Sequence, residues 1–337
     1  MSAFKNLQII KVDKVPISVL LKSPVKLKSL IGDIGINNEI TDKNLHRPQL
    51  ALAGYVGLFT FHRIQVFGNT ECFYLRDLNK EDRIKAFKNI TQFPIPCIIL
   101  TNNNELDPDL IEMAKEASIA VLTTEFETTK AFTLLSEYLD DQFAEQATVH
   151  ASFVDVYGVG ILFVGRSAIG KSEIALDLIE RGHRLVADDV VVLTKVRETV
   201  LMGTGTNLVQ HFMEIRGLGI IDVRQMFGIR AIRFQKRLEI IVELEDWHED
   251  NEYTRTGLDD EPTNLMGIDI NTIKLPIFPG KNITVIAEVI ALNYLLRTYG
   301  YNAAEVFTDK LKDLIEIRKS KKFHQERIIS YFQGDRE

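Results

Sequence analysis

The chain has 337 residues, of which 45% are hydrophobic and 26% are charged. This length predicts two domains, and the composition is that of a globular protein rather than a disordered or fibrous one. Forty basic residues against 47 acidic ones leave a formal charge of −7, which disfavours nucleic acid and anionic membranes as partners.

The start of the sequence and the cysteine content bear on the compartment. The segment MSAFKNLQII lacks the basic segment, apolar run and cleavage site of a signal peptide. No uninterrupted apolar stretch reaches the roughly 18 residues that span a bilayer. The two cysteines, Cys72 and Cys97, lack the spacing of metal ligands, so we expect reduced structural thiols. These features together predict a cytoplasmic protein.

The first half of the chain alternates between strand-like and helix-like segments, which predicts a small α/β domain. Strands are expected at 63–67, 96–100 and 119–122, and helices at 107–117 and 128–138. The pair His46–Arg47 could contact an anion, but such a pair before a proline is also ordinary in a loop. The polar stretch 141–146 is the expected boundary, which gives domains 1–140 and 141–337.

The second half opens with a predicted β-hairpin. Two apolar segments, 153–157 and 161–164, flank Gly158 and Gly160. If Gly158–Val159 forms the turn, the numbers of paired residues sum to about 317. That register places His150 opposite Ser167.

A phosphate-binding motif follows the hairpin. Residues 165–172 read GRSAIGKS and satisfy G-x-x-x-x-G-K-[ST], and a helical pattern follows over 172–181 before Gly182. In such a loop, backbone N–H groups and the positive end of the helix surround phosphate, while the Ser hydroxyl binds Mg²⁺. The residues expected to bind the nucleotide are Gly165, Arg166, Ser167, Ala168, Ile169, Gly170, Lys171 and Ser172.

Two acids come next in the chain. The apolar segment 183–193 is expected to form one strand that carries Asp188 and Asp189 beside the loop. One carboxylate could then hold the metal's water shell, and the other could accept a proton from an incoming hydroxyl. Taken alone, the pair could also be solvated acids at a strand end. Together with His150, it predicts a kinase site that uses ATP and Mg²⁺.

On these residues the chain resembles the HPr kinase/phosphorylases, which phosphorylate a serine of the phosphocarrier protein HPr. The resemblance implies a small N-terminal α/β domain followed by a C-terminal P-loop kinase domain with a mixed sheet, assembled as a homohexamer. The segments that carry it are 149–189, EIRGLGIID at 214–222, 253–258, LPIFPGKN at 275–282, RPQLALAGY at 47–55 and RIQV at 63–66.

The resemblance also implies roles for individual residues. Lys171 and Ser172 would bind phosphate and Mg²⁺, with Glu214 as a second metal ligand. Asp189 would be the catalytic base and Asp188 the metal-side acid. His150 and Arg255 would complete the active site, and Arg216 and Arg255 are cations suited to charge that develops on the phosphoryl group.

Family members also catalyse the reverse reaction, phosphorolysis, in which inorganic phosphate attacks the phosphoserine and leaves as pyrophosphate. One pocket can serve both directions, because a site that holds an ATP phosphate can hold free phosphate. The resemblance implies that two loops take part in phosphorolysis and in contact with the substrate. The first comprises Ile215, Arg216, Gly217, Leu218 and Gly219, and the second comprises Pro276, Ile277, Phe278, Pro279, Gly280 and Lys281.

Two positions depart from the family pattern. Ala168 stands where the loop usually has Gly, and Ala is tolerated without strain only where φ is negative. Phe278 stands where the later loop usually has Arg, so a phosphate-pairing cation is missing there. The second departure bears on phosphorolysis more than on phosphorylation.

Two charged regions and two rival functions remain open. The acid-rich span 243–261 around Trp247 and His248 fits a solvated loop better than a metal site, and basic residues over 310–327 could form a protein-binding or a solvated helix face. A small-molecule kinase would use the same loop and Asp189. A nucleotide-sensing binding module would bind ATP without transfer and would tolerate Asp189→Asn.

Overall fold

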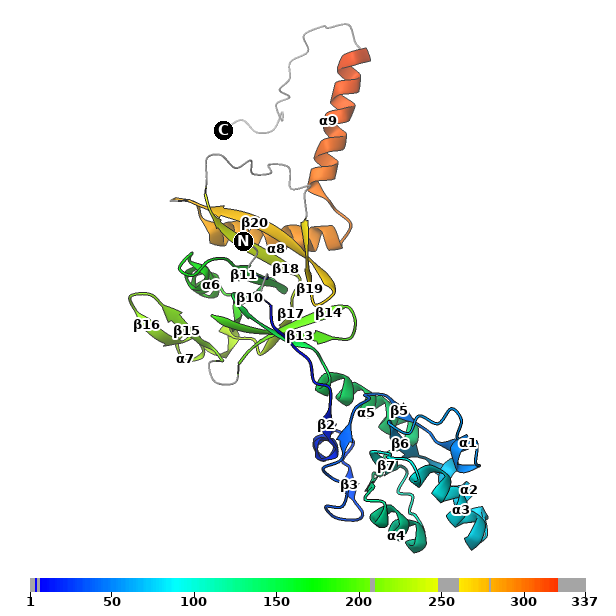
Figure 1. The fold of residues 1–337 in the computed structure, drawn as a ribbon. Coiled ribbons are helices and arrows are strands. Elements are labelled where there is room, and N and C mark those ends of the chain that lie inside the picture. Colours follow the sequence, from blue (N-terminus) through cyan, green and yellow to red (C-terminus); the bar gives the residue numbers. More distant parts are fainter. Residues whose placement is uncertain (1–3, 5–6, 207–209, 248–260, 279, 321–337) are drawn as a thin grey trace. The chain divides into compact units, whose positions relative to one another are not determined.

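The computed structural model describes residues 4, 7–206, 210–247, 261–278 and 280–320 (Figure 1). The chain forms two compact units. One comprises Asn6–Thr148 with Val192–Met202, and the other comprises Val149–Val191 with Gly203–Glu337 and Met1–Lys5. The expected boundary stretch, 141–146, contains the end of a helix and the start of a strand. The fold class is the predicted mixed α/β class.

The N-terminal unit is built on a five-stranded sheet in the order β3-β8-β7-β6-β5. Its strands are β3 (Lys28–Ser29), β5 (Leu45–His46), β6 (Ile64–Phe67), β7 (Cys97–Leu100) and β8 (Ala120–Thr123). All neighbours pair in parallel except β3, which is antiparallel to β8. The central strands are apolar on nearly every residue because helices cover both faces of a parallel sheet.

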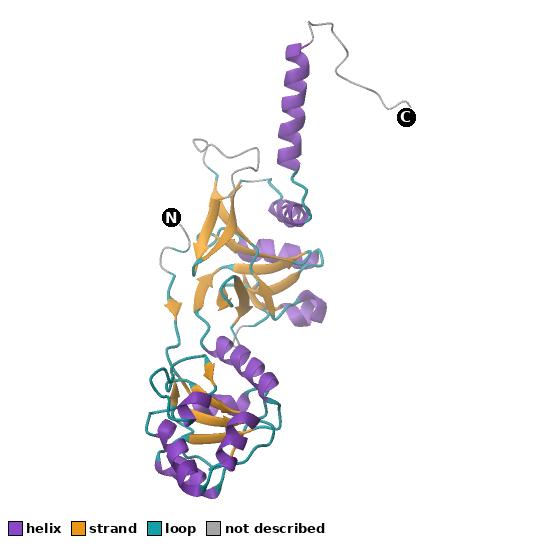
Figure 2. Cartoon of the chain, turned by 90° about the vertical axis from the view of Figure 1, so that its right-hand side faces the viewer, coloured by secondary structure: helices purple, strands orange, loops and turns teal. Residues whose placement is uncertain are grey.

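Two apolar cores lie on the two faces of this sheet, and Figure 2 shows helices around its strands. One face packs against α1 (Gln49–Leu52), α2 (Asn69–Asp77), α3 (Lys80–Thr91) and α4 (Pro108–Glu116). The other packs against α5 (Thr128–Gln142), whose Ala131, Leu135 and Leu139 recur every four residues and form one buried stripe. A short pair, β2 (Val15–Pro16) and β4 (Glu39–Ile40), and the 3₁₀-helix η1 (Ile17–Lys22) add to this second core.

The C-terminal unit contains a six-stranded mixed sheet in the order β12-β10-β11-β18-β20-β19. Its strands are β10 (Ser152–Val156), β11 (Val159–Val164), β12 (Arg184–Ala187), β18 (Ile240–Asp246), β19 (Glu261–Leu265) and β20 (Ile268–Ile277). β11, β18 and β20 are parallel neighbours, whereas β10 is antiparallel to both β11 and β12. The carboxyl ends of three parallel strands therefore meet at one edge of the sheet.

Two helices pack against this sheet, α6 (Lys171–Glu180) and α8 (Ile283–Thr298) (Figure 1). Ala175 and Leu178 of α6 and Ala287 and Ala291 of α8 are fully buried in the same core. At the end of α6, Gly182 adopts φ +97°, as predicted for a left-handed cap. This packing fixes the first turn of α6, and hence the phosphate-binding motif, relative to the sheet.

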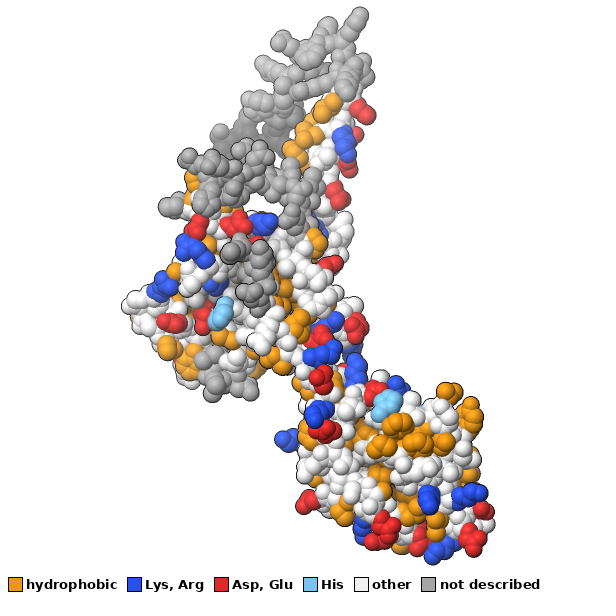
Figure 3. Space-filling view, in the orientation of Figure 1, with side chains coloured by type: hydrophobic (Ala, Val, Ile, Leu, Met, Phe, Trp, Pro, Cys, Tyr) orange, Lys and Arg blue, Asp and Glu red, His pale blue; other side chains and the backbone are white. Residues whose placement is uncertain are grey.

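Other elements complete the described part of the chain. A second sheet has the order β1 (Ile9–Ile10), β9 (Gln146–His150), β13 (Val190–Val196), β14 (Val200–Gly205) and β17 (Gln235–Arg237). The hairpin β15 (Phe212–Ile215) and β16 (Gly219–Asp222) leads to α7 (Val223–Phe227) and the 3₁₀-turn η2 (Ile229–Ala231). The last helix, α9 (Ala303–Ser320), exposes Phe307, Leu311, Leu314 and Ile315, and orange side chains lie along it in Figure 3.

The structure confirms most expected elements and corrects one. The segments β6, β7, α4, β8, α5, β11 and α6 lie where they were predicted. Segment 183–193 is not one strand, because it breaks at Asp188–Asp189 into β12 and β13, which belong to different sheets. Among the helices of the described residues, none is both long and apolar enough to cross a bilayer.

Candidate active site

The phosphate-binding motif connects β11 to α6 and contains three residues with positive φ. These are Gly165 at +151°, Ala168 at +68° and Gly170 at +102°. A Cβ on Gly165 would lie 2.7 Å from the carbonyl oxygen of Leu244, so only glycine fits there. Alternating backbone conformations of this kind turn successive N–H groups inward and make a concavity that accepts anions.

Ala168 has a positive φ, whereas alanine is free of strain only where φ is negative. Its φ of +68° lies in the left-handed region, which costs a residue with a Cβ about 1–2 kcal/mol. This strain comes from the alanine at position 168, a position that the motif G-x-x-x-x-G-K-[ST] leaves open.

Lys171 lies over the loop that precedes it. Its Nζ donates hydrogen bonds to the carbonyl oxygens of Gly165 and Arg166, both at 3.2 Å. The Arg166 side chain forms an ion pair with Asp246 instead, and Ile169 is buried in the core. Of the predicted nucleotide-binding residues, those that line the pocket are Ser167, Ala168, Gly170, Lys171 and Ser172.

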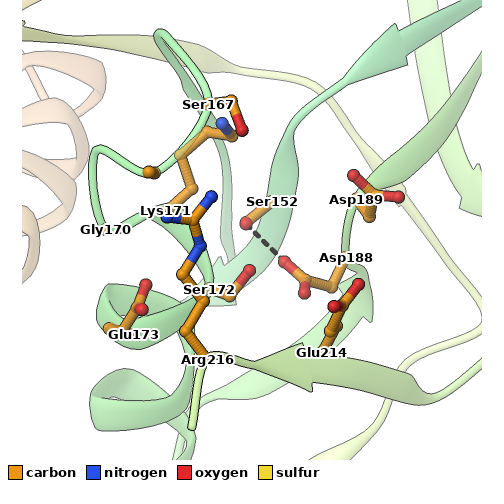
Figure 4. Close-up of a pocket in the computed structure, with 11 residues that line it drawn as sticks. Ser152, Ser167, Gly170, Lys171, Ser172, Glu173, Asp188, Asp189, Glu214 and Arg216 are labelled. Carbon is orange, nitrogen blue, oxygen red and sulfur yellow. Dashed lines mark hydrogen bonds between the residues drawn. The ribbon is translucent and has the colours of Figure 1, made fainter. Parts of the chain in front are cut away.

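A polar pocket opens in front of this loop (Figure 4). It brings the loop together with both acids of the β12–β13 turn and with two residues of the β15–β16 hairpin. The other lining residues are Ser152, Glu173, Asp188, Asp189, Glu214 and Arg216. In Figure 4, Asp188 and Glu214 lie together on the side toward which Ser172 points, and Arg216 extends toward Lys171.

Asp188 is the buried acid of the pocket, with a relative exposure of 5%. Its Oδ1 accepts a hydrogen bond of 2.5 Å from the hydroxyl of Ser152. Its Oδ2 has no hydrogen-bond partner among the described residues. Burial raises the pKa of this carboxyl, and the hydroxyls of Ser152 and Ser172 offset part of that rise.

Asp189 is the exposed acid. Its φ is +62°, and the N–H of Val190 donates to the carbonyl oxygen of Asp188 at 2.8 Å, which closes a γ-turn around it. Its own carbonyl oxygen accepts the N–H of Ala151 at 3.2 Å. The backbone is thus fixed while the side chain is 72% exposed, so a molecule in solution can reach the carboxylate.

His150 lies near Asp189 rather than opposite Ser167. Its Nδ1 is 3.7 Å from Oδ1 of Asp189. The expected register was wrong because Tyr157 and Gly158 form the turn, at φ +52° and +86°, so that paired residue numbers sum to 315 (Val156 with Val159). The β10–β11 pairing also ends at Ser152, and His150 belongs to β9 in the other sheet.

The β15–β16 hairpin supplies the remaining pocket residues. Glu214 pairs with Ile220 and Ile215 with Gly219, so residues 216–218 form its turn. Glu214 and Arg216 line the pocket, Ile215 packs against the core and Leu218 is 67% exposed. Gly217 and Gly219 have φ of +83° and +96°, which the tight turn requires.

The second predicted loop lies elsewhere on the same sheet edge. Pro276 and Ile277 end β20, and Phe278, Gly280 and Lys281 follow before α8. None of these residues lines the pocket. Pro279, Arg255 and the acid-rich residues 248–260 lie outside the described residues, as do the basic residues beyond 320.

Comparison with known proteins identifies the family. The model of the HPr Serine kinase C-terminal domain matches residues 141–311, and that of the HPr Serine kinase N terminus matches residues 15–139. The chain belongs to the HPr serine kinase family. This confirms the resemblance seen in the sequence, and membership of a kinase family implies that the protein uses a nucleotide.

Relatives cover nearly the whole chain. A protein of Chloroherpeton thalassium named HPr kinase/phosphorylase is 55% identical over 92% of both chains. One of Prosthecochloris aestuarii with the same name is 51% identical over 88% of both. The solved Hpr(Ser) kinase/phosphatase of Coxiella burnetii is 33% identical and covers 48% of this chain and 97% of its own, with a TM-score of 0.43.

Sequence reasoning missed two pocket residues of this HPr serine kinase family member, Ser152 and Glu173. Ser152 is a polar residue that is only 1% exposed, at the start of a strand that is buried throughout, which is a signal that could have found it. Glu173 lies in the first turn of α6, directly after the motif. Both were passed over because they are not part of the phosphate-binding pattern.

The pocket of this family member has the donors that Mg²⁺ requires. Ser172, Asp188 and Glu214 offer oxygen atoms, and Oδ2 of Asp188 is buried with no hydrogen-bond partner among the described residues. No group of three or more His, Cys, Asp or Glu side chains in the described part of the chain forms a complete metal cage. Mg²⁺ is usually held by one or two carboxylates together with water and substrate phosphates, so the oxygen atoms of Ser172, Asp188 and Glu214 fit this ion.

Proposed function

We propose that this protein transfers the terminal phosphoryl group of ATP to a serine of an HPr-type carrier protein, with Mg²⁺ as cofactor. The observation that carries the proposal is that Asp188 and Asp189 line the same pocket as Lys171 and Ser172. A phosphate cradle and two acids of different exposure are the parts that phosphoryl transfer to a hydroxyl requires. The names of the relatives support HPr as the acceptor.

Asp189 and Asp188 would have different roles in the reaction. Asp189 is exposed and would accept the serine proton, because an arriving hydroxyl can reach it and His150 lies beside it. Asp188 is buried beside Ser172 and would face the metal together with Glu214. When bound, Mg²⁺ would neutralise charge on the phosphate oxygens. Lys171 and the loop N–H groups would orient the phosphates, and Arg216 would stabilise charge on the transferred group.

The same pocket could run the reaction backward with inorganic phosphate as the attacking group. The names of the relatives, kinase/phosphorylase, support this direction. Phe278 gives no cation to hold the incoming phosphate, which leaves Arg216 and Lys171 as the cations that line the pocket among the described residues. We therefore propose that phosphorolysis is slower relative to phosphorylation than in relatives with Arg at this position.

The proposed assembly is a homohexamer in the cytoplasm. Exposed apolar side chains on α8 and α9 support association between copies of the chain. They lie at four-residue and three-residue spacings along each helix, namely Val285, Val289, Leu292 and Leu296 on α8 and Phe307, Leu311 and Leu314 on α9. Sedimentation of the purified protein measures the number of subunits.

The deciding experiment incubates the protein with labelled ATP, Mg²⁺ and purified HPr and then maps the phosphorylated residue. The proposal requires label on one serine of HPr. Label on a metabolite would favour a small-molecule kinase. ATP binding without any transfer would favour a nucleotide-sensing module.

Replacing the proposed base gives the first prediction. Asp189→Asn should reduce transfer to HPr by about 10²- to 10⁴-fold, the usual contribution of general base catalysis, while ATP affinity changes little. Initial rates and equilibrium ATP binding measure the two effects. Glu198→Gln removes an exposed acid that does not line the pocket and is the control. An Asp189→Asn protein with normal transfer would remove Asp189 from the mechanism.

The reverse reaction gives the second prediction. With phosphorylated HPr and inorganic phosphate as substrates, Phe278→Arg should raise pyrophosphate formation by about 10- to 150-fold, since a cation–phosphate pair typically contributes about 1.5–3 kcal/mol. Forward transfer at saturating ATP should change less. Phe278→Gln, which has similar length and no charge, is the control. Equal pyrophosphate rates for all three proteins would show that position 278 does not contact phosphate.

A further inference from the structure

Two aromatic side chains lie together at the carboxyl edge of the six-stranded sheet. Trp247 follows β18 and Phe278 follows β20, and their ring centroids are 6.2 Å apart at an interplanar angle of 62°. Trp247 is 43% exposed and Phe278 is 41% exposed. Large aromatic rings that remain half in solvent at a ligand-binding edge mark a surface that a ligand can cover.

The strand register places this pair next to the phosphate-binding loop. Val164, the last residue before the loop, pairs with Glu243 of β18, and Asp246 pairs with Ile277 of β20. The N–H of Trp247 donates to the carbonyl oxygen of Ile277 at 3.3 Å, so Trp247 continues the extended strand. It lies three residues, about 10 Å, beyond Leu244, whose carbonyl oxygen lies against Gly165.

An ion pair joins the loop to the aromatic pair. Arg166 donates to Asp246 through Nε at 2.6 Å and through a terminal nitrogen at 2.7 Å, a two-bond geometry that fixes both side chains. Asp246 directly precedes Trp247. The position of the loop is thus tied to that of the tryptophan.

The acids lie on the opposite side of the loop from the aromatic pair. In the sheet order β12-β10-β11-β18-β20, Asp188 and Asp189 follow β12, the loop follows β11, and Trp247 and Phe278 follow β18 and β20. A nucleotide whose terminal phosphates face the acids would extend its other end toward β18 and β20. In open α/β sheets, ligands lie across the carboxyl ends of the strands in this way.

The chemistry of the surface suits a flat, uncharged ring. Lys281 donates from Nζ to the carbonyl oxygen of Pro276 at 3.1 Å and lies 5.2 Å from the centre of the Phe278 ring. The Lys281 ammonium therefore packs on one face of the Phe278 ring by a cation–π contact, and it already has a hydrogen-bond partner. A heterocyclic base can stack on such an aromatic surface whichever polar groups the base carries, because every base has a flat π-face.

We propose that Trp247 and Phe278 form the stacking surface for the purine base of the nucleotide whose phosphates lie in the loop of residues 165–172. The inference rests on the proposed function only in requiring that this loop binds a nucleoside triphosphate. It does not depend on which molecule receives the phosphoryl group. Position 278 would then provide an aromatic ring for the base, whereas the family pattern usually has Arg at this position.

The test compares ATP with inorganic tripolyphosphate, which has the phosphates but no base. Trp247 is the single tryptophan of the chain, so its fluorescence reports on this surface alone. ATP should change the emission of Trp247, whereas bound tripolyphosphate should leave it nearly unchanged. Calorimetric titration measures both affinities.

Variants then separate base binding from phosphate binding. Phe278→Ala and Trp247→Leu should each weaken ATP binding by about 5- to 150-fold and leave tripolyphosphate affinity within about twofold. Trp247→Phe, which keeps an aromatic ring, should retain most of the ATP affinity and guards against a folding defect in Trp247→Leu. Phe307→Leu changes an exposed aromatic residue on α9 and is the matched control.

The outcomes distinguish the two proposals. If both truncated variants bind ATP as tightly as the wild type, or lose ATP and tripolyphosphate affinity equally, the stacking surface is wrong. If ATP binds with the expected dependence on both rings but no phosphate reaches HPr, the stacking surface stands and the proposed function fails. A wild-type protein that binds neither ligand overturns both.

Discussion

Ala168 concentrates strain in the phosphate-binding loop. It has φ +68°, in a loop where both other positive values belong to glycine. A left-handed alanine costs about 1–2 kcal/mol, and residues in such conformations persist only where their surroundings hold them. The loop therefore keeps its shape because β11 and α6 fix its two ends.

Relieving this strain should stabilise the protein. Ala168→Gly should raise the free energy of unfolding by about 0.5–1 kcal/mol, since the gain from the left-handed region exceeds the added entropy of glycine in the unfolded chain. Urea denaturation measures the change. Ala175→Gly within α6 should have the opposite sign, with a loss of about 1 kcal/mol or more. A loss at both positions would contradict the strain interpretation.

At the scale of elements, one carboxylate connects α8 to the end of α6. Glu288 on α8 accepts two hydrogen bonds from Arg181, at 3.0 and 2.7 Å, and lies 3.1 Å from Nε2 of His183. Glu288 is 8% exposed. The hydrogen bonds from Arg181, and secondarily those from His183, hold the pKa of Glu288 below its ordinary value.

This pKa direction sets a pH dependence of stability. Because the folded-state pKa is depressed, the carboxylate stabilises the fold above its unfolded pKa, about 4.5, and this contribution is lost as pH falls through the folded value. Glu288→Gln should lower the free energy of unfolding by about 1–3 kcal/mol at pH 7 and by much less near pH 3. Denaturation at several pH values measures this.

The matched control is Asp309→Asn, which removes an exposed ion pair with Lys312 on α9. It should change the free energy of unfolding by less than about 1 kcal/mol at either pH. A Glu288→Gln effect that is the same at pH 3 and pH 7 would mean that the charge of Glu288 plays no part in joining the helices.

At the scale of the whole molecule, the described residues contain separate apolar cores for the two units. The residues that line the phosphate pocket all belong to the unit that contains α6 and β11. Mg²⁺-ATP at 100 times its dissociation constant should slow exchange of the most protected amides there by about 100-fold. Hydrogen exchange with mass spectrometry should show little change in β6, β7 and β8. Equal slowing in those strands would indicate that the two units unfold together.

Sequence reasoning succeeded where local rules decide the structure. The loop pattern, the Gly182 cap and the apolar strands follow from residue type and spacing, and they lie where they were expected. It failed where long-range pairing decides. The break at Asp188–Asp189 depends on which sheet each half joins, and the position of His150 depends on a turn that lies one residue earlier.

The pocket shows the same division. Lys171, Ser172 and both acids were found because each belongs to a short pattern, whereas Ser152 enters the pocket only through its bond to Asp188. The positive φ of Ala168 could not be read from alanine itself, which favours negative φ. It follows from the path that the chain must take between β11 and α6.

The position of β10 has a mechanical consequence. This strand pairs with β11, which leads into the phosphate loop, and with β12, which leads to the acids, and its Ser152 binds Asp188 directly. When the three strands shift as a body, the separation between Asp189, the proposed proton acceptor, and a phosphate bound in the loop would stay constant. This separation would change only if one strand slid past another. The hydrogen bonds that join β10 to β11 and to β12 resist such sliding.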